Sequence, residues 1–422
     1  MKLILENLGP IGPPISIDLG GLIVIAGEND CGKSTIGKVI FSIVQAFSNY
    51  PIALKRQQRL KYRNMFDSVA INIRHRVDFA KYPELRALLR YPRGGADLAD
   101  APFAEIVDQL HRIADLEPAH QILVNRQIQK ILKMQEELSE PVSAEAIISQ
   151  SIFETLRSEF SGEIVNKQTG GDARVSIVDG ETKVLEVTLN DEKITSFQGG
   201  DPIGFNDATF VEGPAIFQYR HTLSFYDSVG TSVFPSKRQI PFRTIDLSNK
   251  LQGIGYGTSN IEETIAHDVE KVYQGKIYYD QEEEEFFLDK GDFKVAAANA
   301  ASGVKAMAVL ELLLKHDYVR EDTLLILDEP ETNLHPKWQV QYAKAICKLT
   351  AAGAKIIVTS HSPYIVESMK AYSAHENSRF YLATRDSNQN VNFFNTLGDI
   401  SPVIEALSQP LIDMMGDIAD DF

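Results

Sequence analysis

The chain has 422 residues, of which 44% are hydrophobic, enough to bury the core of one large or two medium domains. No apolar run is long enough to span a membrane, no signal peptide is recognisable, and two cysteines cannot form a disulfide framework. These features predict a cytoplasmic protein without a membrane segment. The formal net charge of −16 argues against a surface that coats DNA as a whole.

The charge is unevenly distributed along the chain. Residues 51–93 hold eleven Lys and Arg residues against three Asp and Glu residues, so this segment is strongly basic within an acidic protein. Its densest part is 55–63. Such a run can bind DNA phosphates, but it can equally form a solvated helical face or a surface for an acidic partner.

Short apolar runs, typical of buried strands, alternate with segments whose apolar residues recur at helical spacing. The predicted strands are 1–5, 22–26, 175–177, 184–187, 208–211, 324–327 and 356–359, with a hairpin over 276–279 and 286–288. The predicted helices are one that begins after Gly32 and that Pro51 ends or directly follows, and 122–138, 260–272, 302–315 and 336–350. This alternation predicts an α/β core with parallel strands. Asp413, Asp417, Asp420 and Asp421 are interpreted as a polar tail.

The first motif with chemical meaning is the octapeptide 27–34, GENDCGKS, which fits G-x-x-x-x-G-K-[ST] between a predicted strand and a predicted helix. Glycines let the backbone wrap phosphate oxygens, and the helix N-terminus adds positive potential. Lysine contacts the β- and γ-phosphates in such loops, and serine binds Mg²⁺. The candidate nucleotide-binding residues are Gly27, Asn29, Gly32, Lys33, Ser34 and Thr35. Cys31 is either an oxidation-sensitive thiol or a small residue tolerated in the loop.

Two further motifs follow predicted strands. Asp328 and Glu329 come directly after the apolar run 324–327, at a strand end where open α/β sheets bind their ligands. We expect Asp328 to hold Mg²⁺ and Glu329 to act as general base on the attacking water. His361 follows the run 356–359, where a histidine can contact the γ-phosphate.

A fourth motif opens the predicted helix 302–315. A Ser-Gly pair at a helix N-terminus, here Ser302 and Gly303, can hold a γ-phosphate, although serine is also a common helix N-cap.

These four motifs, in this order, resemble those of the ABC-type ATPase superfamily. Residues 328–336 (DEPETNLHP) and 359–363 (TSHSP) resemble the branch that contains RecF, the OLD-family nucleases and many bacterial anti-phage ATPases. The resemblance covers about 1–50 and 270–370. By this resemblance the Walker A loop is 27–34, the Walker B pair is Asp328 with Glu329, the signature is Ser302 with Gly303, the switch histidine is His361, and the D-loop position is Asn333 with Leu334.

The resemblance implies an α/β fold, a two-lobed ABC ATPase head of the P-loop NTPase type with a β subdomain and helical insertions. We expect an N-terminal lobe from 1–50 and 161–212, a mostly helical insertion over 51–160, a second candidate insertion over 213–270, and a C-terminal lobe over 271–422.

The resemblance also implies ATP and Mg²⁺ as ligands and a head-to-tail homodimer, or a higher assembly of such dimers. ATP on one P-loop is then capped by Ser302 and Gly303 of the other copy. Two departures from the family pattern stand out. Val304 replaces the common second glycine of the signature. No Q-loop glutamine can be assigned, since Gln45 falls inside the P-loop helix and no motif singles out Gln218.

Three functions remain open at this stage. The first is the sensor ATPase of a bacterial defence system with a separately encoded effector, because only 61 residues follow His361 and they lack a clustered acidic metal motif. The second is a RecF-like DNA-repair ATPase that binds DNA through 51–93. A transporter subunit ranks last, because the signature and the large middle insertion are atypical.

Overall fold

The computed structural model describes residues 1–75, 77–78, 80–89, 102–139, 143–218, 240–253 and 260–420, without the side chains of 52, 55–66, 138–139, 260–262, 375, 411 and 415–420. The side chains of the densest basic run therefore lie outside the described residues. The chain divides into two units, residues 1–48 with 148–422, here called the head unit, and residues 49–147, here called the helical unit.

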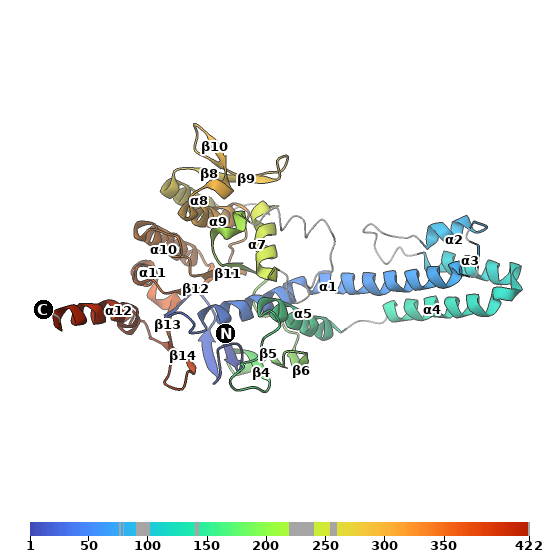
Figure 1. Cartoon of the computed structure of the whole chain (residues 1–422), viewed down its shortest axis with the longest axis horizontal. Coiled ribbons are helices and arrows are strands. Elements are labelled where there is room, and N and C mark those ends of the chain that lie inside the picture. Colours follow the sequence, from blue (N-terminus) through green and yellow to red (C-terminus); the bar gives the residue numbers. More distant parts are fainter. Residues whose placement is uncertain are drawn as a thin grey trace. The chain divides into compact units, whose positions relative to one another are not determined.

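A six-stranded sheet organises the head unit (Figure 1). Its strands, in spatial order, are β14 (Val391–Asn395), β13 (Ser378–Arg385), β3 (Leu22–Gly27), β12 (Lys355–Ser360), β11 (Thr323–Asp328) and β7 (Asp207–Val211). All neighbours are parallel except the β13–β14 pair. Every residue of β3 and β11 is buried, as expected for strands of a parallel sheet covered on both faces.

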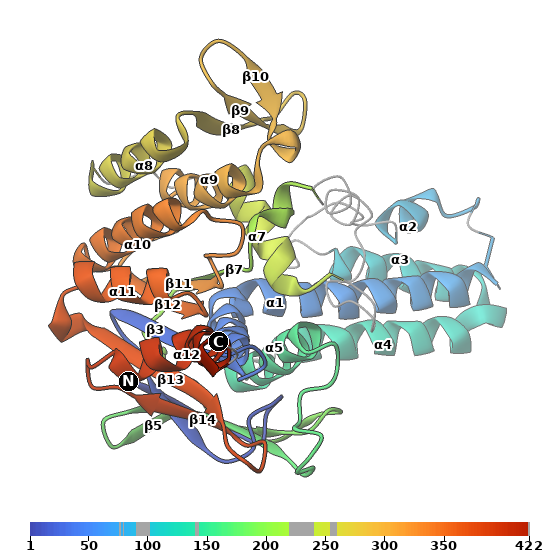
Figure 2. The ribbon, with the colours of Figure 1, turned by 60° about the vertical axis from the view of Figure 1, so that its left-hand side comes forward.

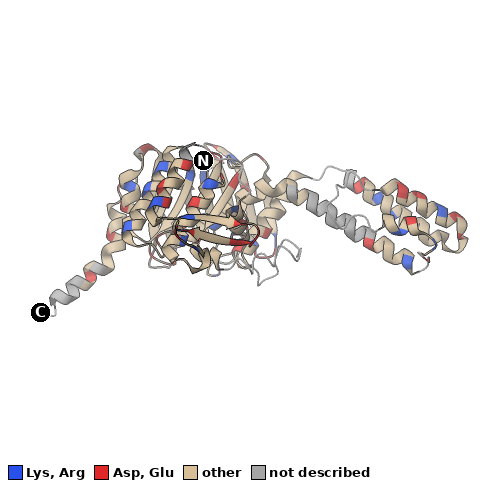
Figure 3. Ribbon diagram, turned by 90° about the horizontal axis from the view of Figure 1, so that it is seen from above, with Lys and Arg blue, Asp and Glu red and all other residues tan. Residues whose placement is uncertain are grey.

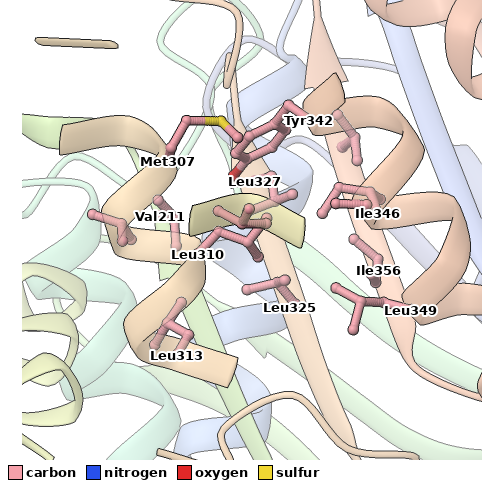
Figure 4. Close-up of a cluster of buried hydrophobic side chains, with 14 of the residues drawn as sticks. Val211, Met307, Leu310, Leu313, Leu325, Leu327, Tyr342, Ile346, Leu349 and Ile356 are labelled. Carbon is pink, nitrogen blue, oxygen red and sulfur yellow. The ribbon is translucent and has the colours of Figure 1, made fainter. Parts of the chain in front are cut away.

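Helices cover both faces of this sheet because side chains alternate along each strand. On one face α1 (Lys33–Arg74) approaches so closely that a Cβ on Gly37 would lie 2.8 Å from Ile326 and 2.9 Å from Phe210. On the other face, Leu325 and Leu327 pack in one core with side chains of α9 (Ser302–Lys315) and α10 (Pro336–Ala351) (Figure 4).

Two more helices extend the layer that contains α9 and α10. Helix α8 (Asn260–Tyr273) packs against both of them, and α11 (Pro363–Tyr372) packs against α10 (Figure 2). Helix α12 (Ser401–Asp420) begins beside α11 and β13. Among the described residues, the head unit also holds most of α5 (Ala144–Glu159), η3 (Pro214–Phe217), α7 (Phe242–Gln252), η4 (Ala297–Asn299) and η5 (His375–Asn377).

Two antiparallel sheets complete the head unit. The first runs β2 (Ile15–Asp18), β1 (Lys2–Glu6), β4 (Ala173–Asp179), β5 (Thr182–Leu189) and β6 (Ile194–Gly199). The second runs β10 (Lys294–Ala296), β9 (Glu285–Asp289) and β8 (Lys276–Asp280). The predicted β8–β9 hairpin is thus confirmed.

The helical unit contains α2 (Pro83–Leu88), α3 (Phe103–Leu116), η2 (Pro118–His120), α4 (Gln121–Ser139) and the distal part of α1. Its own core includes Val69, Ile73, Leu110, Ile113 and Ile131. Charged residues of both signs occur in the helical unit (Figure 3), where α3 is mostly acidic and the basic residues of α4 precede its acidic ones. Among the described residues, no helix combines the length and apolar character that membrane crossing requires.

One sequence prediction about a helix end was wrong. Pro51 does not end the first helix, since α1 continues to Arg74. Proline has a φ compatible with a helix and removes only one N–H donor, so packing of the flanking turns can outweigh it. Helix α12 extends to Asp420 and so includes the residues interpreted as a polar tail, except Asp421, which lies outside the described residues. Its apolar residues Val403, Ile404 and Leu407 pack on the core of the head unit and support a helix there.

The described parts of 213–270 contribute Phe217, Leu251 and Ile265 to the main core of the head unit. The boundaries of the helical unit, 49–147, differ from the predicted 51–160, because 148–159 groups with the head unit.

Candidate nucleotide site

The loop between β3 and α1 has a backbone that only glycine can adopt at its first position. Gly27 has φ of 156°, and a Cβ there would lie 2.1 Å from the carbonyl oxygen of Ala383 on β13. Gly32, with φ of 71°, turns the chain into α1, whose first residue is Lys33. Asn29 is exposed on the loop, whereas Thr35 is buried and donates its N–H to the carbonyl of Gly32. The loop therefore leads directly into a helix N-terminus, the geometry that binds phosphate.

Lys33 is buried, although its side chain is charged. Its Nζ donates to the carbonyl oxygens of Gly27 at 2.9 Å and Glu28 at 2.6 Å, and lies 3.9 Å from Oε1 of Glu329. The ammonium group is thus held inside the loop, beside the carboxylate that follows β11.

Asp328, at the carboxyl end of β11, contacts the other side of the loop. Its carboxylate accepts hydrogen bonds from Oγ1 of Thr359 and from the hydroxyl of Ser34. Burial raises the pKa of Asp328, whereas the hydrogen bonds from Thr359 and Ser34 lower it. The loop predicted to be Walker A and the strand end predicted to carry Walker B therefore meet at a direct contact.

This contact fits Mg²⁺. The ion favours oxygen ligands and is typically held by one or two protein groups together with substrate phosphates. Ser34 and Asp328 supply adjacent oxygens of this kind. No group of three or more His, Cys, Asp or Glu residues suited to an all-protein metal site occurs among the residues that the structure describes.

Glu329 has a left-handed backbone conformation, with φ of 49°, which is unfavourable for residues other than glycine. Its N–H donates to the carbonyl oxygen and to Oγ1 of Thr359 on the neighbouring strand β12, at 3.1 and 3.2 Å, and these bonds hold the turn. Strain of this type is frequent at functional sites, where surrounding structure maintains it.

His361 joins Glu329 from the end of β12. Its Nδ1 lies 3.5 Å from Oε1 of Glu329 and 3.3 Å from Oε1 of Glu331. Glu331 is buried and accepts hydrogen bonds from the N–H of His361 and the hydroxyl of Ser360, and burial raises its pKa. Glu331 therefore fixes the backbone that carries the histidine.

The predicted signature residues occupy a different place. Ser302 is exposed at the first turn of α9, and Gly303 packs closely against the carbonyl oxygen of Asn333 and the ring of Trp338. A Cβ on Gly303 would lie 3.1 Å from both, so its nearest contacts are with the segment after β11. The structure thus brings together Lys33, Ser34, Asp328, Glu329 and His361, and it leaves Ser302 exposed on the surface.

Sequence reasoning missed several residues that position this site. Arg385 on β13 donates from Nε to the carbonyl oxygen of Asp30 at 2.9 Å and pairs with its carboxylate at 2.7 Å, which braces the loop. Thr359 and Glu331, which lie in the quoted motifs without an assigned role, hold the backbone after β11 and β12. A lone Arg, Thr or Glu gives no local signal, because its role depends on which strands become neighbours.

Glu212 is a further missed residue. It follows β7, and the pairing of Val211 with Leu327 brings it level with Asp328, whose pKa its charge helps to raise. Arg243 of α7 donates to Oε2 of Glu212 at 2.7 and 3.0 Å and also pairs with the buried Glu159 of α5. Gln45 instead bonds Asp207 and Ala208 at the opposite end of β7, away from Asp328.

A family model described as "AAA domain, putative AbiEii toxin, Type IV TA system" matches residues 257–367, which include Ser302, Asp328 and His361. No curated protein matches the chain.

Three solved structures of SMC heads resemble the chain at low identity. The head domain from Thermotoga maritima is 12% identical over 94% of this chain and 98% of that one, with a TM-score of 0.38. A head bound to the C-winged helix domain of ScpA is 11% identical over 93% of this chain and 96% of that one, with a TM-score of 0.40. A third structure is a head with an extended coiled coil, bound to the C-terminal domain of ScpA and derived from Pyrococcus furiosus. It is 10% identical over 97% of this chain and 98% of that one, with a TM-score of 0.36.

These SMC likenesses are too distant to indicate function. The parallel sheet, the loop between β3 and α1, and the carboxylates at the end of β11 give this chain an α/β fold of the P-loop type.

Proposed function

We propose that the chain binds ATP with Mg²⁺ at the loop 27–34 and hydrolyses it. The observation that carries this proposal is the convergence of Lys33, Ser34, Asp328, Glu329 and His361 at one edge of the parallel sheet. Ser34 and Asp328 would hold Mg²⁺, which would supply positive charge against the negative charge of the phosphates.

Each of these residues has a role that its position supports. Lys33 exchanges its bonds to the loop carbonyls for phosphate oxygens, and the hydroxyl of Ser34 and the carboxylate of Asp328 would be ligands of Mg²⁺. Glu329 accepts a proton from the attacking water, with its carboxylate fixed by the strained turn. His361, beside Glu329, contacts the γ-phosphate.

The proposed active form is a head-to-tail dimer. Helix α9 runs into β11 through a short connection, so its N-terminus lies at the sheet edge where the P-loop also lies. Ser302 is exposed there and is available to the nucleotide of a second copy. In this arrangement ATP joins the two copies, and hydrolysis releases them.

We further propose that this ATPase is the sensor or regulatory part of a bacterial anti-phage defence system that works with a separate effector, a nuclease or a toxin. Support comes from the match of 257–367 to a family described as a putative AbiEii toxin of a type IV TA system. The test is protection of a bacterial host that expresses the chain with its flanking genes. Protection should be lost with Lys33→Ala. Equal protection by the variant would refute a role for ATP.

The biochemical test is ATP turnover of the purified chain, with and without double-stranded DNA, at low and at physiological salt. The proposal expects turnover that needs Mg²⁺ and does not depend on DNA. Strong, salt-sensitive stimulation by DNA would instead support the RecF-like alternative through the basic segment 51–93. No turnover under any condition would contradict the proposed hydrolysis.

A further inference from the structure

A groove of about 460 Å³ lies between α8 and α10, outside the proposed nucleotide site. Its apolar lining comes from Ile265, Val269 and Val272 of α8 and from Trp338 and Ala345 of α10. Polar residues at the groove include the lysines 271, 337, 344 and 348 and a single acidic residue, Asp268. The groove therefore combines apolar lining with a positive edge in a chain whose net charge is −16.

Only part of this positive charge is neutralised within the molecule. Asp268 pairs with Lys348 at 2.6 Å and with Lys271 at 3.6 Å. Lys337 and Lys344 have no carboxylate partner among the described residues, and Lys344 instead lies over the ring of Tyr372. A ligand with apolar side chains and carboxylates would satisfy both features of the groove.

Helix α12 has this chemistry. It contains Glu405, Asp413, Asp417 and Asp420 and no Lys or Arg, and only acidic charges colour it in Figure 3. Its first turns pack on the head unit, whereas Ile412 and Met414, which flank Asp413, are 53% and 49% exposed. Exposed apolar side chains on an acidic helix are typical of a segment that docks on a partner.

We propose that the groove between α8 and α10 receives the acidic end of α12 from a second copy of the chain. Ile412 or Met414 then covers Trp338, and Asp413 pairs with Lys337 or Lys344. Symmetry allows each of two copies to supply one α12 and one groove, which is the self-complementary form of a dimer contact.

The groove also touches the proposed signature. The ring of Trp338, which lines the groove, is the same ring against which Gly303 packs. An occupant that moves this ring therefore displaces the turn that carries Ser302. This coupling rests on the proposed function, whereas the docking itself does not.

Trp338 is the only tryptophan of the chain, so intrinsic fluorescence reports directly on the groove. The experiment dilutes the full-length protein without nucleotide and follows both its emission maximum and its sedimentation. The proposal expects the emission to shift to longer wavelength as the protein dissociates. An emission maximum that stays constant while the protein dissociates would overturn it, as would a chain that shows no self-association.

Charge reversal makes the test specific. Lys344→Glu and Asp413→Lys should each weaken self-association by about tenfold or more, and the double variant should recover much of the loss. Lys130→Glu, at an exposed lysine on α4, serves as the matched control and should change nothing. Failure of the double variant to recover, or full association of either single variant, would overturn the proposed pairing.

The same measurement in a Lys33→Ala background separates this inference from the proposed ATPase. Self-association and the fluorescence shift should persist in that variant, since docking of α12 needs no nucleotide. If both disappear together with ATP binding, the contact belongs to the nucleotide-dependent dimer and the groove proposal is wrong.

Discussion

The ammonium nitrogen of Lys33 lies 3.9 Å from Oε1 of Glu329, so the P-loop cation and the carboxylate after β11 form an ion pair between distant parts of the chain. Lys33 lies at the first turn of α1, and Glu329 is held in a left-handed turn by Thr359. The pair places the proposed phosphate-binding group and the proposed general base on the two sides of one site.

Replacement of Glu329 by Gln should leave ATP binding intact and slow hydrolysis by about 100- to 10,000-fold, the usual contribution of a general base. The amide keeps the size of the side chain but cannot accept the proton of the attacking water. Because ATP persists, the variant should self-associate more strongly in the presence of ATP than in its absence, as measured by sedimentation. Turnover at the rate of the unmodified chain would show that Glu329 is not the base.

Replacement of Lys33 by Ala should weaken ATP binding by about 10- to 100-fold, because a charged donor to the phosphates is lost. The variant should fail to form the ATP-dependent dimer. Isothermal titration with ATP and Mg²⁺ measures the loss, and Lys2→Ala, at an exposed lysine on β1, is the control that should bind normally. Unchanged affinity of Lys33→Ala would remove the loop 27–34 from the site.

The head-to-tail arrangement predicts complementation between inactive chains. Lys33→Ala damages the P-loop of its own copy, and Ser302→Ala damages the cap that it offers to the other copy. In an equal mixture, half of the dimers are mixed and each keeps one intact site, so turnover should reach about a quarter of the normal value. A mixture no more active than its separate components would argue against sites shared between two copies.

Replacement of Arg243 by Ala should destabilise the fold by about 3–5 kcal/mol, because it leaves the buried carboxylate of Glu159 without its cation. The exposed pair of Arg174 with Glu6 offers a control, for which Arg174→Ala should cost about 0–1 kcal/mol. Thermal unfolding measures both. Equal effects of the two substitutions would show that the buried pair contributes little.

The same Arg243→Ala variant should respond to pH in a defined direction. Burial raises the pKa of Glu159 in the folded chain, and Arg243 opposes that rise. Without Arg243, the pKa of Glu159 in the folded state rises further above its pKa in the unfolded state. The folded state then binds more protons, and stability falls as pH increases through that window. The loss of stability of Arg243→Ala relative to the unmodified chain should therefore be larger at about pH 8 than at about pH 5.

Both cysteines should resist modification in the native protein. Burial raises the pKa of the Cys31 thiol despite the nearby Lys33 and Arg385, and burial raises that of Cys347 to about 12. The thiolate is the reactive form of cysteine. A titration with a thiol reagent should therefore detect little thiol in the native protein and both cysteines in the denatured protein. Rapid native labelling of Cys31 would instead support the interpretation of Cys31 as an oxidation-sensitive thiol.

Local pattern by itself determined the strands of the parallel sheet that carry motifs, the helices that follow them, and the residues Lys33, Asp328, Glu329 and His361. Such signals are local, because a buried strand, a glycine turn and a helix start each depend on a few consecutive residues. The continuation of α1 beyond Pro51 was not predictable in this way, since the contacts that stabilise α1 are tertiary.

Only the tertiary structure decided which distant residues meet. Arg385 reaches Asp30 because β13 lies beside β3, and Glu212 lies level with Asp328 because β7 pairs with β11. Trp338 contacts both the signature turn and the groove because α10 packs beside α8 and α9. Strand order and helix packing set these contacts through the burial of apolar faces, a property of the whole chain that no single segment encodes.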